Sequence, residues 1–178
     1  MWWSRRRLSI VLLVGLAACG FQPLYGQRGA TGGSMPDELA AIRVVPIADR
    51  TGQLLYNNLR DRLNPHGKPV DPRYLLDIAV REEREELALR GDETATRANL
   101  RLMADYVLRR AVSEGEPGKD DIVTKGQSRI TTSYDILDSQ YATIISIEDA
   151  RARATRVLSD DIQARLAVAL SESMARVP

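Results

Sequence analysis

The sequence predicts a domain of the α+β class, in which a β-sheet carries its helices on one face. Alternating apolar and polar residues, typical of a strand, are clearest in residues 122–137. Leucines and isoleucines at four-residue spacing, typical of a helix, mark residues 140–175. A sheet with its helices on one face buries the apolar stripe of each helix. The 178 residues, 44% of them hydrophobic, suffice for one such domain and a short targeting segment.

The first eighteen residues have the pattern of a lipoprotein signal peptide. A basic start containing Arg5, Arg6 and Arg7 precedes an apolar run over residues 8–18 that is too short to span a bilayer. The sequence Leu-Ala-Ala-Cys, ending at Cys19, resembles the lipobox of bacterial lipoproteins, whose cysteine is lipidated and becomes the mature N-terminus. We therefore expect residues 1–18 to be removed and Cys19 to carry a lipid. The alternative is a secretory signal in which the cysteine is only a small apolar residue, and the arginines leave open export by a twin-arginine route.

Residues 19–37 are expected to form the lipidated N-terminus and a flexible tether, because residues 26–37 are rich in glycine and polar residues. Residues 38–178 are expected to form the single domain. The start of the tether is too apolar to be only a spacer. We predict that it packs against a partner or against the domain next to the membrane, through Phe21, Pro23, Leu24 and Tyr25.

The domain is predicted to begin with a strand and a helix. Residues 38–47 have the composition of a strand, and residues 49–65 that of an amphipathic helix with apolar side chains at Leu55, Leu59 and Leu63. Asp49 or Thr51 is suited to cap the start of this helix. The proline- and glycine-rich residues 64–73 predict a loop.

The middle of the chain is less clear. Residues 74–90 begin with the alternation of a strand, but residues 81–86 are all charged and the apolar phase then changes, which indicates a bulge or a strand that projects beyond the core. The same residues also suit a charged helix. Residues 97–112 fit the strand and helix periods equally well, so the pattern leaves their structure open.

The C-terminal third is the most regular part of the chain. Residues 122–137 predict a strand with its β-branched side chains on one face. Residues 140–175 predict a long helix, capped by Asp138 or Ser139. Its apolar stripe consists of Leu158, Ile162, Leu166 and Leu170.

Two stretches resemble one family of envelope proteins. The sequence CGFQPLYG directly after the lipobox and the stretch SYDILDSQYATIISIEDARARATRVLSDDIQARLAVAL near the C-terminus are similar to the LPS-assembly lipoprotein family LptE, in its alphaproteobacterial form. The resemblance implies a four-stranded, mainly antiparallel sheet with two helices packed on one face. It therefore implies that residues 97–112 form a strand, which the periodicity alone does not establish.

The resemblance also implies a function. Members of this family are anchored in the outer membrane, with the domain in the periplasm or in the lumen of the β-barrel LptD, which they plug and help to assemble. The pair inserts lipopolysaccharide into the outer leaflet, and the lipoprotein can bind lipopolysaccharide. It is not an enzyme and needs no cofactor. Gly20 rather than an aspartate follows the cysteine, which agrees with sorting to the outer membrane.

Candidate contacts with the barrel or with lipopolysaccharide lie on the sheet face that the helices leave free. If residues 97–112 are a strand, this face carries Arg97, Arg101, Arg109, Lys125 and Arg129. A simple hairpin would bring Arg109 near Lys125 and Asp105 near Arg129, and like charges opposite one another favour an anionic partner. The alternative is a solvated face neutralised by the neighbouring acids, which are Glu82, Glu83, Glu85 and Glu86.

Other classes of function have little support. His66 is the only histidine and has no cysteine near it, so we expect no metal site. There is no Gly-x-Ser-x-Gly motif, which argues against an envelope hydrolase, and no long basic stretch for nucleic acid. An auxiliary lipoprotein of an ABC-type lipid transport system remains as the alternative, since it would have a similar size and the same anchor.

Overall fold

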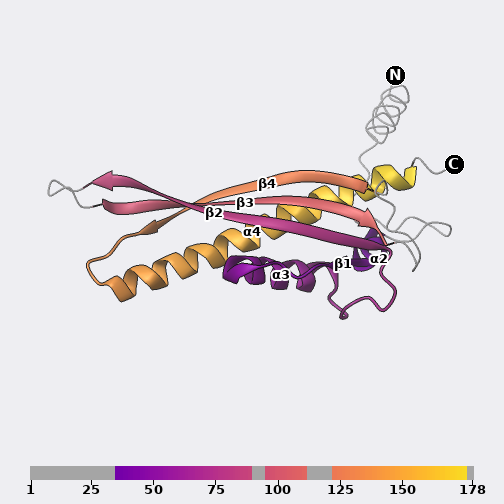
Figure 1. The fold of residues 1–178 in the computed structure, drawn as a ribbon, viewed down its shortest axis with the longest axis horizontal. Helices are drawn as coiled ribbons and strands as arrows, with labels where there is room; N and C mark the ends of the chain where they lie inside the picture. Colours follow the sequence, from indigo (N-terminus) through magenta and orange to yellow (C-terminus); the bar gives the residue numbers. More distant parts are fainter. Residues whose placement is uncertain (1–34, 90–94, 112–121, 176–178) are drawn as a thin grey trace, which may run out of the picture.

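The computed structural model describes residues 35–89, 95–111 and 122–175, which form three helices and one four-stranded sheet (Figure 1). The elements follow one another as α2 (Met35–Ala40), β1 (Ile42–Val44), α3 (Asp49–Leu63), β2 (Tyr74–Leu89), β3 (Ala95–Arg110), β4 (Ile122–Asp135) and α4 (Gln140–Ala175). The sheet order is β1-β2-β3-β4, with β1 parallel to β2 and the other neighbours antiparallel. The predicted α+β class and mainly antiparallel sheet are confirmed.

The segment with ambiguous periodicity is a strand. Strand β3 pairs with β2 on one side and β4 on the other along almost its whole length. From Ala98 to Leu108 its even-numbered side chains, among them Leu100 and Leu102, are buried, and its odd-numbered side chains are not. A central strand with one buried face shows this alternation.

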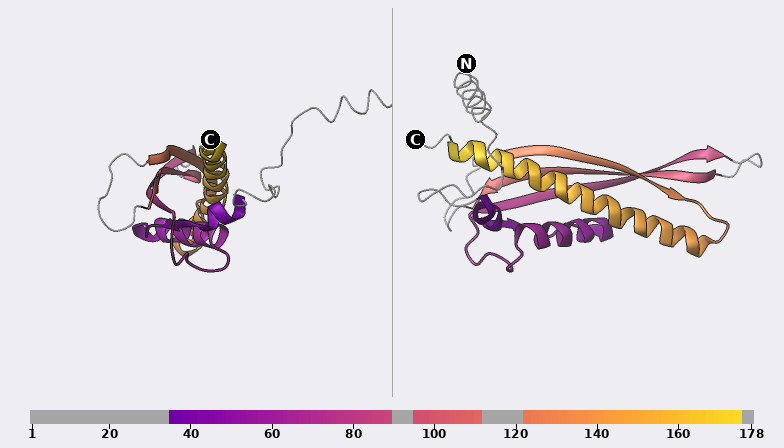
Figure 2. Two further views of the ribbon diagram at one scale, coloured as in Figure 1. Left: turned by 90° about the vertical axis from the view of Figure 1, so that its right-hand side faces the viewer. Right: turned by 180° about the vertical axis from the view of Figure 1, so that it is seen from behind.

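Helices α3 and α4 lie on the same face of the sheet. Seen end-on, the strands lie to one side and both helices to the other (Figure 2). The predicted stripe of α4 from Leu158 to Leu170 is buried, as are Leu55, Leu59 and Leu63 of α3. Helix α4 runs along nearly the full length of the sheet, whereas α3 accompanies only the half nearer to α2 (Figure 1).

The start of the domain differs from the prediction. The expected strand over residues 38–47 is reduced to Ile42–Val44, and a short helix, Met35–Ala40, precedes it within the segment expected to be tether and strand. Pro36 suits the first turn of a helix, where Asp37 and Glu38 also favour the helix dipole. Pro46 has no N–H to donate, so pairing with β2 ends early.

The predicted caps of α3 are not formed. The N-cap position is Ala48, which makes no side-chain capping bond, and Asp49 has a positive φ of 67°. Thr51 instead turns its hydroxyl to Glu82 of β2. The turn is tight here, because a Cβ on Gly52 would lie 2.6 Å from Cγ2 of Ile47. At the start of α4, the N–H of Ala142 donates to Oγ of Ser139 as predicted, at 3.5 Å.

The charged segment after Val80 stays in the sheet. Strand β2 continues to Leu89 and pairs with β3 throughout, with register shifts between Glu86 and Leu89. The predicted bulge is therefore confirmed near the end of the strand, and the helical alternative for these residues is wrong.

Candidate functional site

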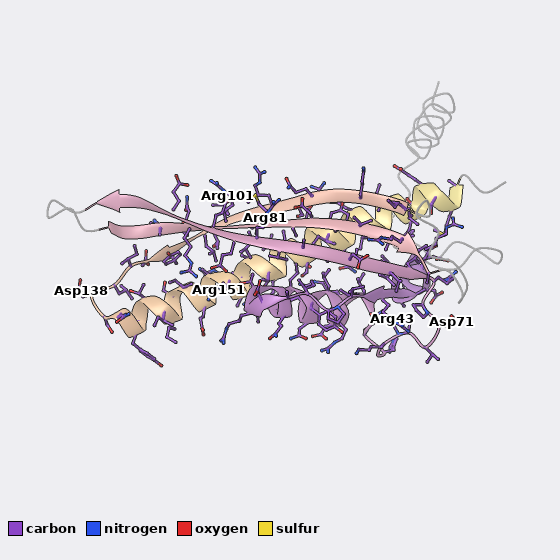
Figure 3. The ribbon with its side chains drawn as sticks, in the orientation of Figure 1. Arg43, Asp71, Arg81, Arg101, Asp138 and Arg151 are labelled. Carbon is purple, nitrogen blue, oxygen red and sulfur yellow. The ribbon has the colours of Figure 1, made fainter. Side chains whose placement is uncertain are left out.

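The open face, by which we mean the sheet face turned away from α3 and α4, holds most of the charged side chains of the strands. The pairing register places there every cationic residue that the sequence singled out, which are Arg97, Arg101, Arg109, Lys125 and Arg129. It adds Arg81 and several carboxylates, Asp77, Glu83, Glu85, Asp105 and Asp135. Figure 3 shows Arg81 and Arg101 on the opposite side of the sheet from Arg151 of α4.

The expected pairing of β3 with β4 is wrong by two residues. Lys125 lies opposite Val107, Asp105 opposite Gln127, and Arg129 opposite Met103. Arg109 lies opposite Ile122, after a register shift that follows Leu108. A shift of two residues keeps each side chain on its face but changes its neighbour. The like charges of Arg109 and Lys125 are therefore not directly opposed.

The arginines of β3 on the open face are paired with carboxylates. Arg109 lies 3.1 Å from Asp77, Arg101 lies 3.5 Å from both Glu83 and Glu85, and Arg97 lies 4.0 Å from Asp135. Asp105 accepts from Arg81 at 2.7 Å and from Gln127 at 2.8 Å. Acids of β2 and β4 therefore neutralise these arginines, and Glu83 and Glu85 do so as expected if the face is simply solvated. Exposed pairs of this kind contribute about 0–1 kcal/mol each, so they exchange partners at low cost.

On the open face, two cations of β4 have no carboxylate partner among the described residues. Within the described part of the chain, Lys125 forms no ion pair, and Arg129 donates only to Oε1 of Gln127, at 3.4 Å. Both side chains are exposed. An anionic group that approaches the open face along β4 would therefore meet positive charge without displacing an acid.

A largely buried ion pair and its hydrogen-bond partners, which we call the Glu82 cluster, join three segments on the other face of the sheet. The carboxylate of Glu82 accepts from Nε and the terminal nitrogen of Arg151 at 2.8 and 2.9 Å, and from Oγ1 of Thr51 at 2.8 Å. Arg84 adds two more bonds, at 3.0 and 2.8 Å. The side chains of Glu82 and Arg151 are only 17% and 16% exposed. The cluster fixes β2 to α3 and α4.

The environment of Glu82 changes its acidity. Partial burial acts to raise the pKa of Glu82, but hydrogen bonds from the two arginines and Thr51 outweigh it and lower the pKa to about 2. The sequence grouped Glu82 with the acids of the open face, which is wrong. Its alternation with Ile78 and Val80 could have placed it on the helix-facing side.

A second polar contact joins β4 to α4. Ser128 of β4 donates to Asp161 of α4, which also accepts from Nε of Arg165 at 2.8 Å. Burial acts to raise the pKa of Asp161, but these hydrogen bonds outweigh it and lower the pKa. Beside this contact Tyr106 lies across Gly126, where a Cβ would come within 2.6 Å of the tyrosine oxygen. The glycine thus makes room for a large side chain of the neighbouring strand.

The predicted anchor lies outside the described residues, together with Phe21, Pro23, Leu24 and Tyr25. Among the residues that the structure does describe, no group of histidine, cysteine and acidic side chains could hold a metal ion. None of the helices in this same part combines the length and the apolar character needed to cross a bilayer.

Comparison with known families gives a match over most of the domain. The model of the family LptE, described as Lipopolysaccharide-assembly, matches residues 39–166. The chain belongs to the LptE family. No curated protein sequence matches it.

Solved structures share the fold of this LptE-family chain. A lipoprotein from Caulobacter crescentus CB15 is 30% identical, with a TM-score of 0.62 over 77% of this chain and 96% of that one. Rare lipoprotein B from Shewanella oneidensis, 17% identical, has a TM-score of 0.55 over 75% and 98% of the two chains. A minor lipoprotein from Acinetobacter baumannii, 13% identical, has a TM-score of 0.52 over 73% and 94%. The last two show a common fold only.

Proposed function

We propose that this protein is an outer-membrane lipoprotein, held by lipid on Cys19, that plugs and helps to assemble an LptD-type β-barrel and so aids insertion of lipopolysaccharide into the outer leaflet. Membership of the LptE family supports the role in lipopolysaccharide assembly. The role needs no catalytic group, and the protein acts by binding.

The observation that carries the proposal is the open face of the sheet. None of the described helices covers it, and its charged side chains are joined by exposed pairs such as Arg109 with Asp77. The lumen of a membrane β-barrel is polar, so a plug needs a polar outer surface. A face of weak, exchangeable ion pairs can form new pairs with a barrel wall without leaving a charge buried and unpaired.

Lipopolysaccharide binding is assigned to the same face. Arg97, Arg101 and Arg109 offer planar forks suited to two hydrogen bonds with a phosphate. Lys125 and Arg129 lack a carboxylate partner among the described residues. We therefore expect β4 to meet an anionic group first, and the arginines of β3 to exchange their acids for it afterwards.

Charge reversal tests this assignment. The double variant Lys125→Glu/Arg129→Glu is expected to lose most lipopolysaccharide binding, and Arg101→Glu/Arg109→Glu also to weaken co-purification with the barrel. Binding is measured by co-precipitation with lipopolysaccharide and by pull-down from solubilised membranes. The matched control is Arg50→Glu/Arg156→Glu, which reverses two charges at exposed helix positions away from the open face. Unchanged binding of both partners in both double variants would refute the assignment.

Depletion of the protein tests the function as a whole. We expect lipopolysaccharide to be lost from the cell surface and the barrel to assemble incorrectly, and Cys19→Ala to restore neither fully because the chain is no longer anchored. Recovery of an inner-membrane permease instead of a barrel in the pull-down would favour an ABC-type transport system. Normal surface lipopolysaccharide after depletion would contradict the proposal.

A further inference from the structure

A cationic pocket lies at the end of the domain that contains α2, next to a loop with one exposed apolar side chain. The pocket has a volume of about 250 Å³ and lies between β1, α3 and residues 68–69. Its cations are Arg43, Arg60 and Lys68, and none of the described residues that line it carries a carboxylate. Close by in the chain, Val70 is 98% exposed, which is the largest exposure among the large apolar side chains of the described residues.

The charges of this pocket are only partly neutralised. Arg60 is held by Asp61 at 3.0 Å and lies 6.0 Å from the ring centre of Tyr56. Arg43 donates only to the carbonyl oxygen of Pro69, at 3.4 Å, and no ion pair within the described ranges involves Lys68. Asp71 follows Val70 but lines a different pocket, so it reduces the positive charge here without cancelling it.

The loop that carries Val70, residues 64–73, is held at both of its ends by contacts with residues 38–42. Asn64 donates to the carbonyl oxygens of Ala40 and Ile42, at 2.9 and 3.0 Å. Arg73, at the other end of the loop, pairs with the buried carboxylate of Glu38 in α2 at 2.8 Å. Figure 3 shows Arg43 and Asp71 at this end and Asp138 at the opposite end of the molecule. Helix α2, the first described element after the proposed anchor in the chain, therefore lies at this end of the domain.

We propose that this end docks on the surface of a bilayer that carries anionic phosphate headgroups, with Val70 among the lipids and Arg43 and Lys68 on phosphates. The inference rests on the proposed anchor, which keeps this end near a membrane. Each basic residue close to an anionic surface contributes about 1 kcal/mol. A soluble phosphate could fill the cationic pocket but would leave Val70 in water, so the pair of features favours a lipid surface.

A single tryptophan reports this docking directly. Both native tryptophans, Trp2 and Trp3, lie in the predicted signal peptide, so Val70→Trp gives a mature chain with one tryptophan, whose emission is excited selectively over that of the tyrosines. The lipidated variant is reconstituted in phosphatidylcholine vesicles with or without phosphatidylglycerol. Emission is expected to shift to shorter wavelength only when phosphatidylglycerol is present. Emission typical of water in both vesicles, or equal shifts in both, would overturn the proposal. So would an equal shift caused by inorganic phosphate alone.

Partitioning measures the contribution of the charges without the anchor. The mature chain with Cys19→Ser is sedimented with phosphatidylglycerol-containing vesicles. Arg43→Gln/Lys68→Gln is expected to lower the partition coefficient about thirtyfold. The control Arg50→Gln/Arg156→Gln removes the same charge from exposed helix positions and is expected to change it less than about twofold. Equal losses in the two double variants would refute the site. Neither experiment involves the barrel. If the protein still recovers the barrel in the pull-down but does not bind vesicles, the membrane docking is refuted and the proposed function is not.

Discussion

The two halves of the domain are built differently. In the two-helix half, which contains α2, the helices α3 and α4 together cover the sheet and bury leucines and isoleucines from both (Figure 1). In the one-helix half, α4 covers the sheet alone, and none of its residues before Ala150 is fully buried. There Tyr141 is 73% exposed, and Ile144 and Ile145 are also exposed. The comparison shows that regular secondary structure continues well beyond the part of the molecule where burial is deepest.

The Glu82 cluster marks the boundary between these halves. Thr51 lies in the first turn of α3, and Arg151 lies just after the point where α4 begins to bury side chains. The charged residues of β2 beyond Glu82 therefore belong to the half without α3. The hydrogen bonds of the Glu82 cluster therefore fix the position of the start of α3 relative to β2 and α4.

The largest expected effect is in the core of the two-helix half. Leu59→Ala removes a fully buried side chain between α3 and its neighbours and should lower the free energy of unfolding by about 3 kcal/mol. Urea denaturation measures it. A loss below about 1 kcal/mol would show that α3 contributes little and that the contrast between the halves is wrong.

Removing the carboxylate of the Glu82 cluster should lower the free energy of unfolding by somewhat less than Leu59→Ala does. Glu82→Gln leaves Arg151 largely buried without its carboxylate and should lower the free energy of unfolding at neutral pH by about 2 kcal/mol. Urea denaturation at pH 7 measures this loss. The replacement of both partners, Glu82→Gln with Arg151→Met, should recover part of it, because no unpaired charge then remains buried.

The wild type and Glu82→Gln should also differ in how their stability changes at acidic pH. Because the pKa of Glu82 is lowered from 4.5 to about 2, its contribution is complete above pH 4.5 and is lost as the pH falls through 2. The unfolding free energy of the wild type should therefore fall more steeply over this range than that of Glu82→Gln. Asp161, whose pKa is also lowered, leaves a residual slope in the variant. Parallel profiles would contradict the role of the cluster.

A smaller effect is expected at the contact between Tyr106 and Gly126. Gly126→Ala places a methyl group 2.6 Å from the tyrosine oxygen, so the ring must move, at a cost of about 1–2 kcal/mol. Thermal unfolding measures the change. Tyr106→Phe combined with Gly126→Ala should restore only a small part of the loss, because Cζ of the ring would still lie 2.8 Å from the new methyl group. The absence of any loss in Gly126→Ala would contradict the close contact.

The smallest effect is expected in the one-helix half. Ile144→Ala removes an exposed side chain and should change the free energy of unfolding by less than about 0.5 kcal/mol. Urea denaturation under the same conditions as for Leu59→Ala measures the change. A loss as large as that of Leu59→Ala would mean that the first turns of α4 are part of the core.

The elements with strong periodicity could be predicted, and the contacts between distant segments could not. The stripe of α4 from Leu158 to Leu170 is regular enough to identify both the helix and its buried side. In β3, Leu100 and Leu108 satisfy both periods, so only the strands on either side determine its structure. The register of β3 with β4 depends on the length of their connection, which has no local pattern. Glu82 and Arg151 lie 69 residues apart, and nothing near either of them indicates the other.

The position of α4 in the chain affects when the domain can fold. This helix is the final described element, and it covers the buried faces of β3 and β4 as well as one side of α3. The strands and α3 can therefore be complete while their leucines are still in water. Contacts between segments far apart in sequence form late and slowly. A chain synthesised from its N-terminus would thus remain loosely structured until α4 has been made.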